Sequence, residues 1–290
     1  MTEAADRTEL EASAAKFQQA VDASPYFAQG WLVLGELREK LGDREAAIAA
    51  YRRVRDLDPD DTFGAVLRLG RLGVEEDVAM PEVFVRSLFD QYAAKFDAAL
   101  VDGLSYCGPA LLREAVERVC GREGRAVHFE AMLDLGCGTG LAGEEFQPLA
   151  ASITGVDLSP QMLAIAQAKG DYKRLEVNEI IRFLKAEAGV GAHYDLILAA
   201  DVLPYFDDLR PVAAACARLL NAGGLLAFTV EACDGDGVML GQKLRFTHGA
   251  AHLREAARGA DLAVLELNET TTRTEDGLPV PGYLAVMRRG

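Results

Sequence analysis

Residues 133–140, with the sequence Leu-Asp-Leu-Gly-Cys-Gly-Thr-Gly, constrain the fold of this chain more than any other stretch. An apolar run at residues 131–133 leads to an acid, Asp134, and then to three glycines at alternate positions. This order predicts a buried strand that enters a tight turn, because glycine permits the unusual backbone angles of such a turn and leaves room for a ligand against bare backbone. Residues 141–146 can then begin a helix whose free N–H groups point back over the turn. The stretch therefore predicts a ligand site at the end of a strand.

Beyond the turn, short apolar runs alternate with segments of helical period. We expect strands at residues 152–156, 173–177, 194–199, 224–230, 262–269 and 283–288, and helices near residues 160–168, 180–188, 209–219 and 250–257. This order predicts an α/β fold with a doubly wound, mostly parallel sheet of seven strands that resembles a Rossmann fold. Residues 270–281 join the last two strands without a helix, so those strands should form an antiparallel C-terminal hairpin.

The first 75 residues have helical period throughout and predict a small all-α module. Trp31, Gly35, Tyr51 and Pro59 stand at spacings that resemble one full tetratricopeptide repeat of about 34 residues, with truncated repeats on either side. Small residues would let two antiparallel helices approach closely, with Trp31 and Tyr51 filling the seam. So short an array seldom stands alone. The module therefore either caps and stabilises the rest of the protein, docks a protein or peptide partner, or packs on a second copy in a homodimer.

Residues 76–125 would connect this module, residues 1–75, to the sheet domain at residues 126–290. The connecting segment contains an aromatic helical stretch in which Phe89, Tyr92 and Phe96 lie three and four residues apart and share one helical face. Such a face is either ordinary core or, beside a ligand site, a lid over the ligand.

Residues 134–140, Asp-Leu-Gly-Cys-Gly-Thr-Gly, resemble motif I of the class I S-adenosylmethionine-dependent methyltransferases, and the resemblance extends over residues 89–289. A dinucleotide-binding turn would have the spacing Gly-x-Gly-x-x-Gly. Here the glycines alternate and an acid precedes them, which suits a cationic ligand better than a pyrophosphate. The resemblance implies S-adenosylmethionine as the cofactor. It implies cofactor contacts in the glycine turn, at the ends of the following strands and in the aromatic stretch: Asp134, Gly136, Cys137, Gly138, Thr139, Gly140, Asp157, Leu158, Met162, Glu179, Ile180, Ala200, Asp201, Tyr92 and Phe96.

The roles that the resemblance implies have physical reasons. Asp157 ends the second strand, where a carboxylate can accept hydrogen bonds from both ribose hydroxyls. Met162 would pack on the adenine, and Glu179 would accept a hydrogen bond from the adenine amino group. Tyr92 and Phe96 are the lid candidates, because aromatic faces attract a sulfonium.

Methyl transfer from a sulfonium is an in-line displacement, which requires positioning and, for some acceptors only, a base. Asp201, Tyr205 and His248 are the candidates for orienting or deprotonating an acceptor. Asp201 follows the strand that resembles the family's motif IV, whereas His248 is interpreted equally well as a structural histidine. We expect no metal site, because His248 and His252 lack a third ligand. Cys137 is interpreted as a small packing residue rather than a nucleophile.

Charge and composition limit the partners. The formal net charge of −15 argues against nucleic acid and anionic membranes, since both require a basic surface. Five cysteines without a CxxC pair, a polar and acidic start and the lack of a long apolar run predict a cytoplasmic protein. The predicted function is methyl transfer to a small-molecule acceptor or to a protein or peptide. The alternative is a cofactor-binding scaffold that acts through its helical repeats.

Overall fold

The computed structural model describes residues 2–76 and 78–290; Asp77, in the predicted connecting segment, lies outside them. The chain forms two compact units, residues 1–84 with 240–244 and residues 85–239 with 245–290. Residues 85–125 of the predicted connecting segment thus belong to the second unit. Within the described ranges, no helix has both the length and the apolar character that crossing a membrane requires.

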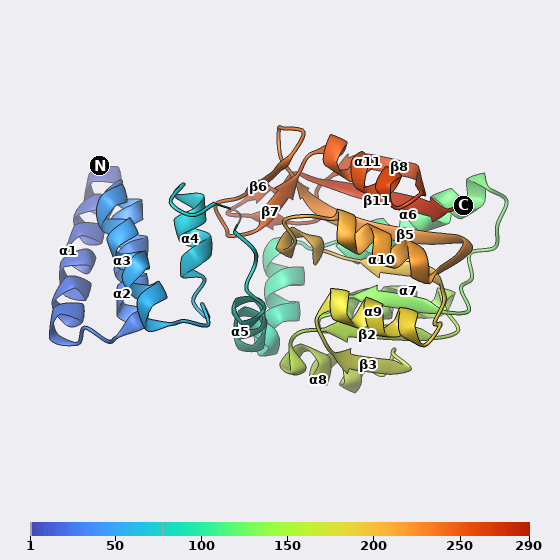
Figure 1. Cartoon of the computed structure of the whole chain (residues 1–290), viewed down its shortest axis with the longest axis horizontal. Helices are drawn as coiled ribbons and strands as arrows, with labels where there is room; N and C mark the ends of the chain where they lie inside the picture. The colour runs from blue at the N-terminus through green and yellow to red at the C-terminus, as the bar shows by residue number, and fades with distance from the viewer. Residues whose placement is uncertain (1, 77) are drawn as a thin grey trace. The chain divides into compact units, whose positions relative to one another are not determined.

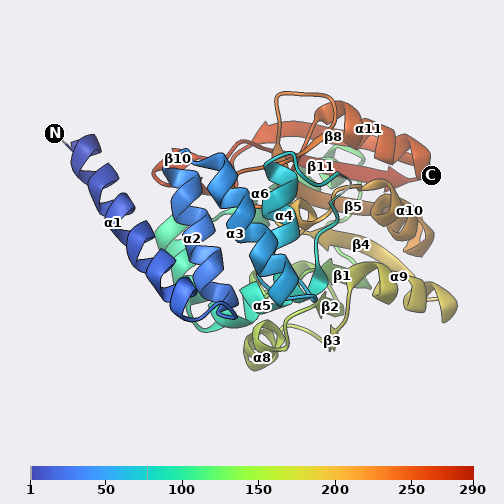
Figure 2. The same cartoon turned by 60° about the vertical axis from the view of Figure 1, so that its left-hand side comes forward.

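The first unit is a set of consecutively packed helices (Figure 1; Figure 2). They are α1 (Thr2–Ala23), α2 (Ala28–Lys40), α3 (Arg44–Leu57) and α4 (Ala65–Arg71). α2 packs against both α1 and α3, and α3 packs against α4. Gly35 permits the approach of α2 to α3, because a Cβ atom there would lie 2.5 Å from the ring of Tyr51. Trp31 is half-buried and donates its indole N–H to the Pro25 carbonyl oxygen over 3.1 Å. The helical module is confirmed, and its assignment to a repeat family stays a prediction.

The second unit is organised around a sheet of nine strands, seven of which follow the order β3-β2-β1-β4-β5-β11-β8. These seven are β1 (Met132–Leu135), β2 (Ile153–Asp157), β3 (Arg174–Val177), β4 (Tyr194–Ala199), β5 (Leu220–Ala232), β8 (Leu262–Thr270) and β11 (Gly282–Arg289). β1 to β5 are parallel to one another, and β11 lies antiparallel between β5 and β8. The mostly parallel sheet with an antiparallel C-terminal hairpin is confirmed.

Short strands go beyond the seven that were expected. β7 (Phe246–His248) pairs in parallel with the end of β5, and β6 (Val238–Leu240) pairs with β7. β9 (Thr274–Glu275) and β10 (Leu278–Pro279) form a separate two-stranded sheet. With two or three residues each, these strands are too short for an alternating pattern to reveal them.

Helices cover both faces of the sheet (Figure 1). One core lies under α9 (Ile180–Gly189), α10 (Arg210–Leu219) and α11 (Ala250–Gly259), and the other under α6 (Gly108–Arg122), α7 (Leu141–Phe146) and α8 (Pro160–Lys169). Successive strand residues point to opposite faces, so Leu133 and Leu135 of β1 join the first core and Met132 joins the second. A parallel strand covered on both sides is apolar throughout, and only Asp134 interrupts this rule in β1.

The remaining short helices lie in the connections. They are α5 (Glu82–Tyr92), η1 (Ala93–Lys95), η2 (Ala98–Gly103), η3 (Gln147–Leu149) and η4 (Leu203–Tyr205). In the sheet, β1 and β4 are neighbours, although the chain goes from β1 to β2 and β3 on the other side. Connections that diverge in this way open a crevice at the carboxyl ends of the two strands. The glycine turn follows β1 at this point.

Candidate active site

Backbone geometry explains the three glycines of the turn. Gly136, Gly138 and Gly140 have φ values of +65°, +53° and +91°, in the left-handed region that other residues rarely adopt. At Gly136 a Cβ atom would lie 2.3 Å from Cγ2 of Val202, so only glycine fits between the turn and the chain after β4. At Gly138 the corresponding Cβ position has no heavy atom within 4 Å. The turn thus packs against the protein at Gly136 and leaves free space for a ligand at Gly138.

Asp134 lies beneath this turn with only 1% of its surface exposed. One carboxylate oxygen, Oδ2, accepts a hydrogen bond of 2.6 Å from the Tyr172 hydroxyl, which in turn accepts one of 3.0 Å from the Gly143 N–H. The other oxygen, Oδ1, is buried and has no partner in the part of the chain that the structure describes. Burial raises the pKa of Asp134 to about 7, against the opposing effect of the Tyr172 hydrogen bond. A buried carboxylate oxygen without a donor fits a cationic group of a ligand.

Asp157 joins the end of β2 to the glycine turn. Its Oδ2 accepts a hydrogen bond of 2.9 Å from the Gly138 N–H, and its Oδ1 accepts one of 2.8 Å from the Ser159 N–H. Burial raises its pKa, and these backbone N–H groups oppose the rise. Leu158 beside it is partly exposed. The structure therefore brings the predicted ribose carboxylate to within one hydrogen bond of the open glycine.

The residues predicted for the adenine differ in their placement. Both carboxylate oxygens of Glu179 cap α9, accepting hydrogen bonds of 2.7 Å from the N–H groups of Ile181 and Arg182. Met162 has no exposed surface and Ile180 has 6%. The backbone N–H of Met162 donates a hydrogen bond of 3.0 Å to the Ser159 hydroxyl, which caps α8. Met162 is thus fully buried in the structure, whereas Leu158 is a partly exposed apolar side chain beside Asp157.

The two side chains between the glycines point into the protein. The Cys137 sulfur packs on β2, since a Cβ atom on Gly155 would lie 2.8 Å from it. Burial raises the pKa of this thiol, with Asp134 and Asp157 adding to the rise, so it stays protonated and is a poor nucleophile. The Thr139 hydroxyl is buried and donates a hydrogen bond to Asp97. Ala200, after β4, is half-buried against the core under α6–α8.

Asp201 follows β4 in a left-handed conformation, with φ +54°. Its Oδ1 accepts a hydrogen bond of 3.0 Å from the Thr229 hydroxyl, and its Oδ2 accepts one of 3.1 Å from the Thr272 hydroxyl and one of 2.8 Å from Arg273 Nη1. A carboxylate with these partners is held rigidly in one orientation. The structure places Asp201 after β4, with both of its carboxylate oxygens bound by other side chains.

Arg273, which the sequence did not single out, connects three carboxylates. Besides Asp201 it binds Glu231 at the end of β5 and, over 2.9 Å, Glu275. Arg245 binds the same two glutamates. Both guanidinium groups are therefore fully paired, and the cluster contains one more carboxylate than guanidinium. This arrangement leaves no unpaired cation in the cluster for an anionic acceptor.

Two tyrosines lie near this cluster. The Tyr205 ring makes an edge-to-face contact with Phe89, with centroids 5.4 Å apart; burial raises its pKa to about 12, and the guanidinium groups of Arg245 and Arg273 oppose the rise. Burial also raises the pKa of Tyr106, which lies within electrostatic reach of both Asp201 and Asp134. Tyr106 was not predicted, because it stands in the irregular connection before α6, where no periodicity marks it.

His248 lies outside the site. Its ring has no exposed surface and stacks on His252 at a centroid distance of 5.5 Å. Burial lowers the pKa of His248 to about 4, so the ring is neutral at physiological pH. A neutral ring with no access to solvent cannot exchange a proton with an acceptor in the crevice. Among the described residues, no group of three histidine, cysteine or acidic side chains is arranged to hold a metal ion.

The two predicted lid residues, Tyr92 and Phe96, differ in how far they are buried. Phe96 is half-buried and contacts Phe89 edge-to-face at 6.1 Å. Tyr92 is 55% exposed, because α5 ends at Tyr92 and the chain tightens into η1. The aromatic face therefore consists of Phe89 and Phe96, with Tyr92 free to contact a ligand or solvent.

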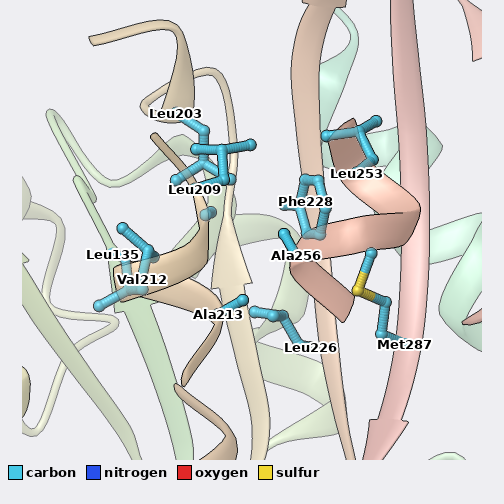
Figure 3. Close-up of a pocket in the computed structure, with 11 residues that line it drawn as sticks. Leu135, Leu203, Leu209, Val212, Ala213, Leu226, Phe228, Leu253, Ala256 and Met287 are labelled. Carbon is cyan, nitrogen blue, oxygen red and sulfur yellow. The ribbon is translucent and has the colours of Figure 1, made fainter. Parts of the chain in front are cut away.

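An internal gap of about 20 Å³ lies within the second unit, away from these residues. Figure 3 shows that side chains of α10, α11 and the sheet surround it. Its lining is entirely apolar: Leu135, Ala199, Leu203, Leu209, Val212, Ala213, Leu226, Phe228, Leu253, Ala256 and Met287. A gap of this size and chemistry is a packing defect rather than a ligand site.

Comparison with known proteins gives consistent results. A family model described as "Methyltransferase domain" matches residues 133–226. The chain is 30% identical over 173 residues to a ubiquinone biosynthesis O-methyltransferase of Methylobacterium nodulans, covering 53% of this chain and 70% of that protein. It is 29% identical over 159 residues to the protein of the same name from Methylocella silvestris, covering 52% of this chain and 61% of the other. Across this relative and two further ones, from Cronobacter sakazakii and Xanthomonas oryzae, the chain spans 61, 48 and 40% of their length.

Solved structures agree on the fold. Magnesium protoporphyrin IX methyltransferase from Synechocystis PCC 6803, solved with bound S-adenosylmethionine, superimposes with a TM-score of 0.53 at 16% identity, over 74% of this chain and 100% of that one. An S-adenosylmethionine-dependent methyltransferase from Clostridium acetobutylicum gives 0.52 at 17% identity, over 70% and 99% of the two chains.

Proposed function

Because this chain belongs to the class I S-adenosylmethionine-dependent methyltransferases, we propose that it transfers the methyl group of S-adenosylmethionine to a small-molecule acceptor bound beside Asp201. The observation that carries the proposal is the unpaired, buried Oδ1 of Asp134 below an open glycine turn. A carboxylate oxygen in this environment is costly unless a cation binds it. The α-ammonium group of S-adenosylmethionine is such a cation.

Four residues of the chain would each contact a different part of the cofactor. Asp134 would bind the ammonium group, Asp157 the ribose hydroxyls, and Glu179 the adenine amino group, with Leu158 in apolar contact with the adenine. When bound, S-adenosylmethionine supplies a methyl group on a positively charged sulfur. The carboxylate excess around Asp201 favours that positive charge on the acceptor side of the crevice.

On the acceptor side, the proposed roles are positioning roles. Tyr106 and Tyr205 would orient the acceptor by hydrogen bonds, and Asp201 would hold the chain after β4 in place through Thr229, Thr272 and Arg273. In-line displacement requires such alignment more than a base. The relatives named O-methyltransferases favour a hydroxyl group as the acceptor, and the proton that this hydroxyl loses on methylation would pass to water.

Calorimetric titration with S-adenosylmethionine tests the cofactor assignment. Asp157→Ala should weaken binding by about a hundredfold, since it removes charge-assisted hydrogen bonds to the ribose and the tie between β2 and Gly138. Asp208→Ala is a matched control, because Asp208 is a partly exposed carboxylate that bonds Arg210 instead. Unchanged affinity in Asp157→Ala would refute the assignment.

A labelling experiment tests the acceptor class. Incubation of the protein with cell extract and S-adenosylmethionine carrying a labelled methyl group should place the label in the low-molecular-weight fraction. Label recovered only in protein would contradict the small-molecule proposal and favour a protein or peptide acceptor.

We infer, finally, that the helices of the first unit are related to tetratricopeptide repeats, an assignment supported by the close approach at Gly35 and Tyr51. Its connection between α1 and α2 presents Tyr26, which is 83% exposed with the Arg53 guanidinium 5.8 Å from its ring centroid. If the unit docks a partner, Tyr26→Ser should weaken that association without changing the melting temperature. A partner bound equally well by the variant would favour the stabilising role.

A further inference from the structure

Residues 89–97 lie across the ends of three strands. Phe89 contacts Tyr205 in the connection after β4. Asp90 accepts a hydrogen bond of 2.6 Å from the Ser159 hydroxyl after β2. Asp97 accepts a hydrogen bond from the Thr139 hydroxyl in the glycine turn after β1. Because the carboxyl ends of these parallel strands meet at one edge of the sheet, the segment spans the crevice at that edge.

Asp97 binds the glycine turn through one carboxylate oxygen and α8 through the other. Its Oδ1 accepts from Thr139, whose side chain is buried between two of the cofactor glycines. Its Oδ2 pairs over 2.9 Å with the ammonium group of Lys169 in the last turn of α8, and Lys169 also lies 3.7 Å from Glu144. The Asp97 carboxylate thus connects the chain between η1 and η2 to the glycine turn and to α8.

Asp90 binds the loop at the end of β2, which contains Asp157 and Ser159 and is called the ribose loop below. Its Oδ1 accepts from the Ser159 hydroxyl and, at 3.4 Å, from the Gln161 N–H. Ser159 in turn accepts a hydrogen bond from the Met162 N–H and caps α8. Its own N–H is bound to Asp157. Asp90 is therefore one residue removed from the carboxylate proposed to bind the ribose.

We propose that Asp90 and Asp97 are positioning residues that fasten residues 89–97 over bound S-adenosylmethionine and thereby control its exchange. The proposal rests on the proposed function, because it takes the cofactor to lie between the glycine turn and the ribose loop. The two carboxylates are seven residues apart, which is about two helical turns. Asp90 therefore contacts the loop after β2, and Asp97 contacts the glycine turn.

The dissociation rate of S-adenosylhomocysteine, measured by stopped-flow mixing, tests this arrangement. Asp90→Ala and Asp97→Ala should each accelerate dissociation about tenfold, the effect expected for the loss of one hydrogen bond to a charged group. Asp208→Ala serves as the control. The side-chain exposures of Asp208, Asp90 and Asp97 are 33, 29 and 37%, and Asp208 touches neither loop. Its dissociation rate should equal that of the wild type.

A double-mutant cycle separates fastening from general stabilisation. If Asp97 acts through Thr139, the variant with both Asp97→Ala and Thr139→Val should release the ligand no faster than either single variant. A structural role alone would lower the melting temperature and leave the two effects on the rate independent. The conservative Asp97→Asn, which retains an acceptor for Thr139, should restore a rate closer to that of the wild type.

The outcomes distinguish the two proposals. Wild-type protein that fails to bind S-adenosylhomocysteine would overturn the proposed function and this inference with it. Wild-type binding together with unchanged dissociation in Asp90→Ala and Asp97→Ala, or multiplicative effects of Asp97→Ala and Thr139→Val, would overturn the fastening role alone.

Discussion

The buried carboxylate of Asp134 should make the stability of this protein fall as pH rises. Burial raises its pKa from the ordinary 3.8 to about 7 in the folded chain. Between these values the unfolded chain has released the proton that the folded chain still holds, so each pH unit lowers the free energy of unfolding by about 1.4 kcal/mol. The full effect is about 4 kcal/mol, present as extra stability below pH 4 and lost above pH 7.

Asp134→Asn isolates this effect from the other titrating groups. The asparagine can still accept from the Tyr172 hydroxyl, and its amide leaves a buried donor unpaired at every pH. That constant cost cancels when the difference between variant and wild type is compared across pH. Relative to the wild type, the variant should therefore gain about 3 kcal/mol in unfolding free energy between pH 5 and pH 8. Urea denaturation at both pH values measures it.

The affinity for the ligand should change with pH in the opposite direction from the stability. Wild-type affinity for S-adenosylmethionine should rise through pH 7, as Asp134 ionises and can pair with the ammonium group, whereas Asp134→Asn should bind weakly and lack this component. Titration of the ligand itself is common to both proteins and cancels in the comparison. A difference in unfolding free energy that stays constant from pH 5 to pH 8 would refute the reasoning.

Two further predictions concern the turn and the charged cluster. Gly136→Ala should lower the melting temperature more than Gly138→Ala, because its Cβ would lie 2.3 Å from Val202 while that of Gly138 meets open space; calorimetry should show that Gly138→Ala nevertheless loses cofactor affinity. Arg273→Met should cost about 3–5 kcal/mol in urea denaturation, since it leaves Asp201, Glu231 and Glu275 with a single guanidinium; a loss under 1 kcal/mol would argue against the cluster.

Sequence periodicity predicted the sheet because each long strand is buried on both faces and each helix has a single apolar side. It also placed Asp134, Asp157 and Asp201 correctly at strand ends, where a change from apolar to acidic residues is visible in one dimension. It could not show that Met162 is fully buried, because the packing of a residue in the first turn of a helix depends on the tertiary structure around it. It left two roles open for His248, and the structure buries that ring against His252 of α11.

Sequence could not show what each carboxylate does, because the role of a buried acid is decided by its partners. Asp134 and Asp201 look alike along the chain, since each follows a run of apolar residues. Tyr172, 38 residues away, leaves one oxygen of Asp134 unpaired, whereas Arg273, 72 residues away, helps to occupy those of Asp201. The first acid therefore has an oxygen that can bind a cation, whereas both oxygens of the second are already bound by the protein. Distinguishing them required the folded chain, because loops far apart in sequence supply the partners.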